Sequence, residues 1–244
     1  MKFQLTPVLS LMEEIYRIPI GQERFRAYIN ILNGGDKGKL AVPIGGYNPM
    51  AKEVVLERLL KMKNLGAEEI AEEALFEINK KLENSEKVIK VGLNLVDDLG
   101  GAWSNFYQTK YESIFKFNGV FNYDFCAPYF WMSEEITEEL IRERTKAYVW
   151  RTVFWLYYAK PTNLISHLNQ EIFVCVNMES AEDEIPTEIE HLKLYYQIHE
   201  QSTDFSRIFN FFYGDEASTS INHPTFGIGE KNGFDLAKSI AVNE

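Results

Sequence analysis

Two adjacent aspartates, Asp97 and Asp98, are the side chains of this sequence best suited to do chemistry. They follow an apolar run and precede Gly100 and Gly101, where the backbone can turn sharply or come close to a ligand. Two carboxylates at such a point can hold Mg²⁺, because hard cations take carboxylate oxygens, or one of them can act as a general base. The sequence therefore predicts a metal-assisted or acid–base site at Asp97 and Asp98. The alternative is that one caps a turn while the other is solvated.

Several loops are expected to meet beside these aspartates. In an open α/β sheet, ligands bind beyond the carboxyl ends of the strands, where loops and helix N-termini converge. The loops that follow the expected strands carry polar, glycine and aromatic residues. The predicted ligand-binding residues are Tyr47, Asn48, Gly100, Gly101, Trp103, Asn105, Trp131 and Arg151.

Arg151 differs from the others because it lies in the middle of the apolar run AYVWRTVFWLYYA, at 147–159. A guanidinium in such surroundings must find a carboxylate or several carbonyls, since an isolated buried charge is very costly. Either Arg151 orients an anionic substrate or it forms an internal ion pair. Asp97 and Asp98 are candidate partners.

The elements that must position these residues are short strands between helices. Ile89, Val91, Leu93 and Leu95 alternate with other residues, which predicts a strand with one buried face. Further strands are expected at 40–44, 120–131 and 171–178, where EIFVCVNM is typical of a buried strand. Helices between them favour a helix-rich α/β fold with a small, mostly parallel or mixed sheet of about four short strands. A mainly α protein with a minor β piece is the alternative.

Helical periodicity predicts how the rest of the chain is organised. Residues 1–35 are expected to form a helical hairpin packed on a single globular domain, 1–244, and residues 49–82 a second hairpin. A helix is expected near 105–117, although Asn118 and Gly119 could form a hairpin turn instead. Ser133 is expected to cap a long helix, and Asn232 to precede the last one. His199 falls on an apolar stripe, which predicts a hydrogen-bonded histidine rather than a metal ligand.

Composition limits the classes of partner. The formal charge is −11, and all of the acidic excess lies beyond residue 85, so nucleic acid is not an expected partner. No apolar run is long enough to span a bilayer and the first residues do not resemble a secretory signal, so a cytoplasmic protein is expected. The preferred function is small-molecule binding at the strand ends, with or without catalysis. The alternative is a non-catalytic interaction module whose acidic segment, 179–190, binds a basic protein.

Overall fold

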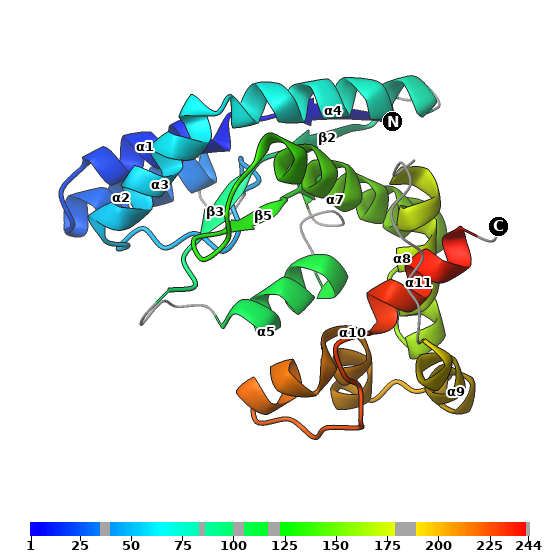
Figure 1. The fold of residues 1–244 in the computed structure, drawn as a ribbon. Helices are drawn as coiled ribbons and strands as arrows, with labels where there is room; N and C mark the ends of the chain where they lie inside the picture. Colours follow the sequence, from blue (N-terminus) through cyan, green and yellow to red (C-terminus); the bar gives the residue numbers. More distant parts are fainter. Residues whose placement is uncertain (35–39, 83–85, 100–104, 117–122, 179–188, 243–244) are drawn as a thin grey trace. The chain divides into compact units, whose positions relative to one another are not determined.

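A computed structural model describes residues 1–34, 40–82, 86–99, 105–116, 123–178 and 189–242, drawn in Figure 1. The chain divides into two compact units, unit 1 (Met1–Val149) and unit 2 (Trp150–Glu244). The described residues are mostly helical and contain a small parallel sheet, which confirms the predicted helix-rich α/β class. Whether both units form one domain stays a prediction.

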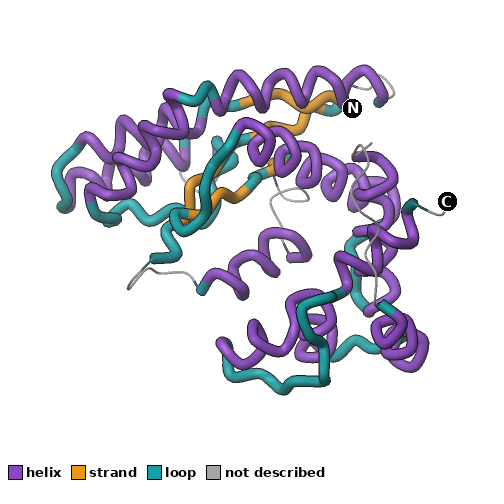
Figure 2. The backbone as a smooth tube through the Cα atoms, viewed as in Figure 1, coloured by secondary structure: helices purple, strands orange, loops and turns teal. Residues whose placement is uncertain are grey.

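The sheet of unit 1 is a bent ribbon of parallel strands (Figure 2). Strands β1 (Lys2–Leu5), β2 (Val88–Val91) and β4 (Phe125–Cys126) pair in the order β1-β2-β4, and β3 (Asn94–Val96) pairs with β5 (Tyr129–Trp131). Backbone hydrogen bonds continue across the bend, from Gly92 N–H to Cys126 O (3.0 Å) and from Asn94 N–H to Pro128 O (2.9 Å). The ribbon therefore ends, on its carboxyl side, at Val96 and Trp131.

The bend is located at Gly92 because other chain segments press against it. A Cβ atom there would lie 2.4 Å from Val8 Cγ2 and 2.7 Å from Pro43 Cγ. The predicted alternation holds in β2, where Lys90 is exposed between buried neighbours, but Gly92 and Asn94 are buried. The prediction of one solvated face is therefore wrong for β3, which is covered on both sides.

Four helices connect β1 to β2: α1 (Val8–Arg17), α2 (Gln22–Asn33), α3 (Glu53–Asn64) and α4 (Ala67–Lys81). Helix α1 packs on α2 and α3, while α4 lies along β1 (Figure 1). Buried side chains at helical spacing form one core with the strands, including Leu9, Met12, Leu59, Leu95 and Phe130. Helix α5 (Phe106–Tyr111) continues as the π-helix η1 (Glu112–Lys116), which confirms the helix expected there; the alternative turn at Asn118 and Gly119 lies outside the described residues.

Two strand assignments from the sequence need correction in unit 1. Residues 40–44 form no strand; Pro43 lacks an N–H to donate, and the segment instead crosses the ribbon at Gly92. Strand β1 was not predicted, because only four residues, KFQL, carry its signal. Thus the first strand precedes the N-terminal helices, and the expected hairpin of residues 1–35 begins with a strand.

Unit 2 is helical throughout its described part. Helix α7 (Glu138–Tyr158) enters from unit 1 and is followed by α8 (Leu164–Met178), α9 (Glu190–His199), α10 (Phe205–Ser220) and α11 (Gly233–Ala241). The strand predicted at 171–178 is wrong, because these residues are the second half of α8. Leu164, Leu168, Glu171 and Val174 are buried at helical spacing, so tertiary packing overrides the β propensity of the run.

Local capping sets where two helices begin. Helix α11 begins directly after Asn232, as the sequence predicts, and Asn232 caps it in a reciprocal arrangement with Asp235. The cap expected at Ser133 is wrong: α7 begins later, where the Thr137 hydroxyl oxygen accepts the Leu140 N–H at 3.1 Å. In the described part of the chain, every helix falls short of the length and apolarity that a bilayer crossing requires.

Candidate functional site

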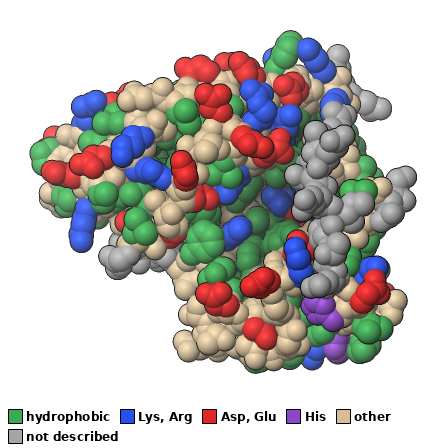
Figure 3. All heavy atoms as spheres, viewed as in Figure 1, with side chains coloured by type: hydrophobic (Ala, Val, Ile, Leu, Met, Phe, Trp, Pro, Cys, Tyr) green, Lys and Arg blue, Asp and Glu red, His purple; other side chains and the backbone are tan. Residues whose placement is uncertain are grey.

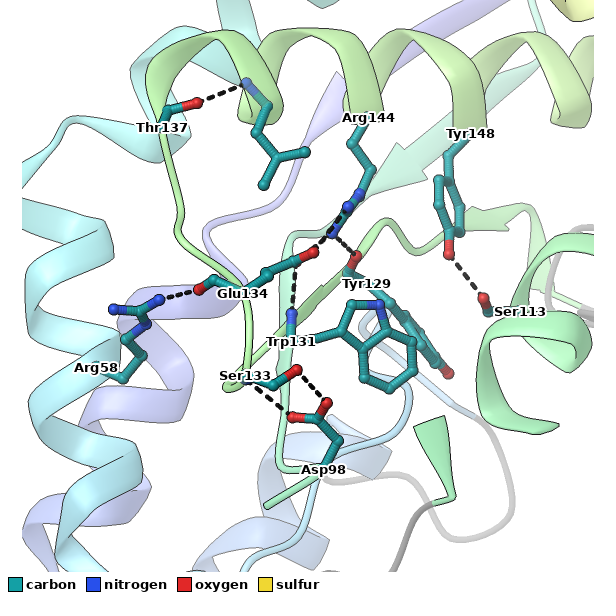
Figure 4. A network of polar contacts seen from close by, with 11 residues as sticks. Arg58, Asp98, Ser113, Tyr129, Trp131, Ser133, Glu134, Thr137, Arg144 and Tyr148 are labelled. Carbon is teal, nitrogen blue, oxygen red and sulfur yellow. Dashed lines mark hydrogen bonds and ion pairs between the residues drawn. The ribbon is translucent and has the colours of Figure 1, made fainter. Parts of the chain in front are cut away.

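Asp97 and Asp98 directly follow β3, but the structure gives them different surroundings. Asp98 accepts the Ser133 N–H at 3.1 Å and the Ser133 O–H at 2.5 Å, one on each carboxylate oxygen (Figure 4). Among the described residues, Asp97 accepts the Leu99 N–H alone, at 3.2 Å. Asp98 therefore ties the loop after β3 to the loop after β5, whereas Asp97 keeps most of its capacity to accept hydrogen bonds.

The loop containing Gly45 and Gly46 lies directly on β3 and β5. A Cβ atom at Gly45 would come within 2.2 Å of the Tyr129 hydroxyl oxygen, and one at Gly46 within 2.9 Å of Val96 Cγ2. Gly46 also has a φ of +63°, a conformation that favours glycine. The two glycines thus allow the next residue, Tyr47, to reach the carboxyl edge of the ribbon.

Asn94 holds this loop in place from inside the core. Its carboxamide oxygen accepts the Gly45 N–H at 2.9 Å, and its amide nitrogen donates to the carbonyls of Pro43 (3.0 Å) and Gly92 (2.7 Å). The side chain is fully buried. A buried amide with three such partners holds the loop in one position, because each of the three backbone groups would otherwise be buried without a hydrogen bond.

Three tyrosines cluster where the loop meets α1 and α2. The Tyr47 ring lies 5.0 Å from the Tyr16 ring and 5.1 Å from the Tyr28 ring, between centroids. The Tyr16 hydroxyl donates to the Asn48 carbonyl oxygen at 3.0 Å. The Tyr47 hydroxyl, in contrast, is buried and has no hydrogen-bond partner among the described residues. Besides burial, the nearby Tyr16 hydroxyl raises the pKa of Tyr47 through its charge and through a side-chain hydrogen-bonding interaction, although the pair falls outside ordinary hydrogen-bond geometry.

A buried arginine gives the cluster a positive charge. Arg24 is 5% exposed and donates to the carbonyl oxygens of Ile18 (2.5 Å), Tyr16 (2.9 Å) and Ala51 (3.1 Å). These carbonyls include those at the C-terminal end of α1, which a cation stabilises. Among the described residues, no carboxylate lies within ion-pair distance of Arg24.

Burial raises the pKa of the Tyr16 and Tyr47 hydroxyls far above their ordinary value. The Asp97 carboxylate raises the pKa of Tyr16 further, while Arg24 lowers both in part. Both phenols therefore stay protonated at neutral pH and can donate hydrogen bonds but not act as bases. Asp97, whose charge acts on Tyr16, is a carboxylate near this cluster that can accept a hydrogen bond.

An ion pair between Glu134 and Arg144 fixes the loop after β5 (Figure 4). The Glu134 carboxylate accepts the Trp131 N–H at 2.8 Å and pairs with Arg144, which also donates to the Tyr129 carbonyl at 3.1 Å. Arg58 donates to the Glu134 carbonyl oxygen. These contacts hold Ser133, and with it Asp98, in a defined position.

The remaining predicted residues of unit 1 have local roles in the structure. The Trp131 ring is buried and lies 4.8 Å from the Phe106 ring. Asn48 closes a turn by accepting the Met50 N–H at 2.9 Å, and Asn105 caps α5 by accepting the Gln108 N–H at 3.1 Å. Gly100, Gly101 and Trp103 lie outside the described residues.

Arg151 belongs to unit 2, where it forms an ion pair with Glu171. The distances are 2.9 Å from Nε to Oε1 and 2.6 Å from Nη2 to Oε2. The internal ion pair that the sequence predicts as one of two possibilities is therefore present. Its carboxylate is Glu171, twenty residues along the chain, and not Asp97 or Asp98.

The structure adds residues that the sequence did not single out. Tyr16 and Tyr28 lie within the two N-terminal helices and carry no signal of a binding site, while Arg24 carries no distinguishing signal in QERFR. Asn94 could have been noticed, since an amide between Leu93 and Leu95 in a strand is unusual. Within the described ranges, no three histidine, cysteine or acidic side chains gather to hold a metal, so Mg²⁺ at Asp97 and Asp98 stays a prediction.

The chain was compared with protein-family models, with curated proteins and with solved structures, and none of the three comparisons found a match.

Proposed function

We propose that unit 1 binds a small molecule at the carboxyl ends of β3 and β5, with Tyr47 and Asp97 as its polar contacts. The observation that carries this proposal is the buried Tyr47 hydroxyl without a partner in the described structure. A buried polar group that makes no hydrogen bond costs about 1–3 kcal/mol, and few native side chains are left in that state without a reason. A ligand oxygen that accepts this hydroxyl would remove the cost.

The available groups define the kind of ligand. Tyr47 offers a donor whose pKa is raised by burial, and Asp97 offers a carboxylate that accepts one local N–H. A complementary ligand has an acceptor, such as a carbonyl oxygen, near a donor, such as a hydroxyl or amine. In a reaction, Asp97 would accept the proton and Tyr47 would stabilise negative charge on the ligand oxygen, the division of roles expected for acid–base catalysis.

Asp98 then has a positioning role. Both of its oxygens are engaged by Ser133, so it orders the two loops that flank the proposed site. Mg²⁺, if it takes part, would bind through the oxygens of Asp97 that Leu99 leaves available and would retain several waters.

The test is a small-molecule screen by thermal shift and NMR on the full chain, with hydroxy acids, amides and hydroxyketones as probes. Compounds that bind should lose at least about tenfold in affinity in Tyr47→Phe and in Asp97→Asn, the loss expected for a buried hydrogen bond of about 1.4 kcal/mol or more. Asp124→Asn, which removes an exposed carboxylate of the same unit, is the control and should bind normally. Unchanged affinity in both site variants would rule out the proposal.

A separate titration tests the metal. Mg²⁺ should raise the melting temperature of the natural protein and not of Asp97→Asn if the carboxylate is a ligand. Equal shifts in both proteins would place Mg²⁺ elsewhere.

The alternative function stays a prediction. Its acidic segment, 179–190, lies almost wholly outside the described residues. On the face drawn in Figure 3, acidic and basic side chains are interspersed over unit 1, so that face offers no surface of one sign for a basic partner.

A further inference from the structure

A second cluster of polar side chains lies in unit 2, where α9 meets the first turn of α10. Arg207 Nη1 is 3.0 Å from His199 Nε2 and 3.4 Å from the Tyr195 hydroxyl oxygen. The guanidinium carbon lies 4.5 Å from the ring centroid of Phe226, in the loop before α11, and 6.0 Å from that of Tyr195. Two segments of the chain, α9 and the loop before α11, thus contact the guanidinium of this half-buried arginine.

The hydrogen bonds between that guanidinium and the described residues involve one of its three nitrogens, Nη1. Nη1 donates to His199 Nε2, whereas Nε and Nη2 have no partner in the described part of the chain. No carboxylate of the described residues lies within ion-pair distance of Arg207. The edge that carries Nε–H and Nη2–H, which binds two oxygens side by side, is therefore unengaged.

Arg207 differs from the arginines of the chain that are paired with a carboxylate. Arg17, Arg142, Arg144 and Arg151 each pair with a glutamate. Arg207 instead lies against the rings of Phe226 and Tyr195, and its hydrogen-bonded neighbour is an imidazole. A guanidinium ordered in advance loses little conformational entropy on binding an anion, and stacking leaves its edge available.

His199 also affects how the cluster would bind an anion, because its imidazole can take up a proton. Because Nε2 accepts from Arg207, the ring proton resides on Nδ1 and the imidazole is neutral. Burial, and then the charge of Arg207, lower the pKa of His199. A dianion beside Arg207 would oppose that effect and favour uptake of a proton, whereas Asp204 and Asp215, which act on Tyr195, disfavour any anion.

We propose that the Nε–Nη2 edge of Arg207, flanked by His199 and Phe226, binds a phosphate group. The ligand class is a phosphate monoester or inorganic phosphate, whose oxygens match the two parallel N–H groups and whose second charge suits the adjacent imidazole. This site lies in unit 2 and does not depend on the function proposed for unit 1.

The experiment is an NMR titration of the full chain with sodium phosphate at pH 7, with sodium chloride at equal ionic strength as the reference. We expect saturable shifts of the Arg207 Nε–H and His199 Hε1 signals with phosphate alone. Arg207→Lys keeps the charge but lacks the paired N–H groups, so its affinity should fall at least tenfold, and Arg207→Gln should show no saturation. Arg142→Gln, which alters an arginine paired with Glu73, should bind like the natural protein.

Two results would overturn the proposal. One is an equal response to chloride in the natural protein, which would reduce the effect to screening. The other is a saturable phosphate response that persists in Arg207→Gln. If the Arg207 variants do not fold, Phe226→Leu keeps the charge and loosens the guanidinium, and it should weaken binding severalfold; an unchanged affinity there would count against the site. A repeat with phosphoserine distinguishes a phosphate monoester from the free ion.

Discussion

The buried arginines of the two units differ in what neutralises them. In unit 2, the Arg151 guanidinium and the Glu171 carboxylate pair through two hydrogen bonds, and their side chains are 12% and 3% exposed. Gln170 donates to the same carboxylate at 2.8 Å, and the Trp155 indole N–H donates to Gln170. In the described part of unit 1, Arg24 donates to carbonyl oxygens alone, and the nearby Tyr47 hydroxyl has no hydrogen-bond partner.

That difference distinguishes residues that stabilise the fold from residues that are available to bind a ligand. A charge pair whose partners come from the same fold is complete before any ligand arrives, so it stabilises and specifies packing. A cluster with a residual positive charge and an unused donor is incomplete until something else supplies an acceptor. By this criterion Arg151, which the sequence presents as a ligand-binding residue, is structural, and Tyr47 is the residue to test for binding.

The largest effect should come from breaking the complete network. Glu171→Gln leaves Arg151 charged and buried without its carboxylate, and such a loss costs about 3–5 kcal/mol. Urea unfolding followed by fluorescence measures it. The control is Glu73→Gln, which breaks the exposed pair with Arg142 and should cost under about 1 kcal/mol. A Glu171→Gln protein as stable as the control would show that the pair is not what completes unit 2.

The next largest effect on stability is expected at Asn94, which holds the loop beside the proposed site. Asn94→Asp is nearly the same shape, but it replaces the amide donor by an oxygen that faces the carbonyls of Pro43 and Gly92. We expect a loss of about 3 kcal/mol, because two acceptors and a buried carboxylate are left unsatisfied. Hydrogen exchange should show the loss at the amide of Gly45. If that amide stays protected, Asn94 does not hold the loop.

Local signals explain what the sequence could predict. Ile89 and Val91 show β2 by alternation, Asn232 shows where α11 begins, and the aspartates after β3 mark the strand end by their charge. Each of these depends on neighbours within a few residues. They are therefore readable without knowledge of tertiary packing.

The sequence-based predictions fail where contacts with residues far along the chain determine the structure. EIFVCVNM has the composition of a strand, yet it is helical because Glu171 must face Arg151 and Val174 must reach the core, contacts that lie outside the segment. The unpaired state of Tyr47 depends on Tyr16 from α1 and on Asn94, which places the loop. No pattern within residues 45–48 contains that information, so the residue was predicted but its reason was not.

A smaller effect is expected from a completed pair at the surface. Hydrogen bonds from Lys63 and Arg17 lower the pKa of Glu13 below its ordinary value of 4.5, and join α1 to α3. A lowered pKa means that the folded protein binds this proton less readily than the unfolded chain. The stabilisation, about 0.5–1 kcal/mol, is therefore present above pH 4.5 and is lost as the pH falls through the folded pKa.

Glu13→Gln checks this with melting curves at pH 7 and pH 3. The variant should be less stable than the natural protein at pH 7, and this difference should be smaller at pH 3. A gap that does not narrow on acidification would exclude the carboxylate as its source.

The smallest effect on stability is expected at Tyr47. This residue tests most directly the comparison between the surroundings of Arg24 and those of Arg151. Tyr47→Phe removes a buried hydroxyl that has no partner in the described structure, so the free energy of unfolding should stay within about 0.5 kcal/mol or rise slightly. The matched variant is Tyr16→Phe, which removes a hydroxyl that donates to the Asn48 carbonyl and should cost about 1 kcal/mol.

Two tyrosines whose rings lie 5.0 Å apart would then respond oppositely to loss of the same atom. That outcome is expected only if Tyr16 completes the fold while Tyr47 is kept for another molecule, because natural proteins retain a destabilising group where function requires it. Equal losses in the two variants would show that the Tyr47 hydroxyl already has a partner in the folded protein, which would rule out a ligand bound through it at this edge of the ribbon.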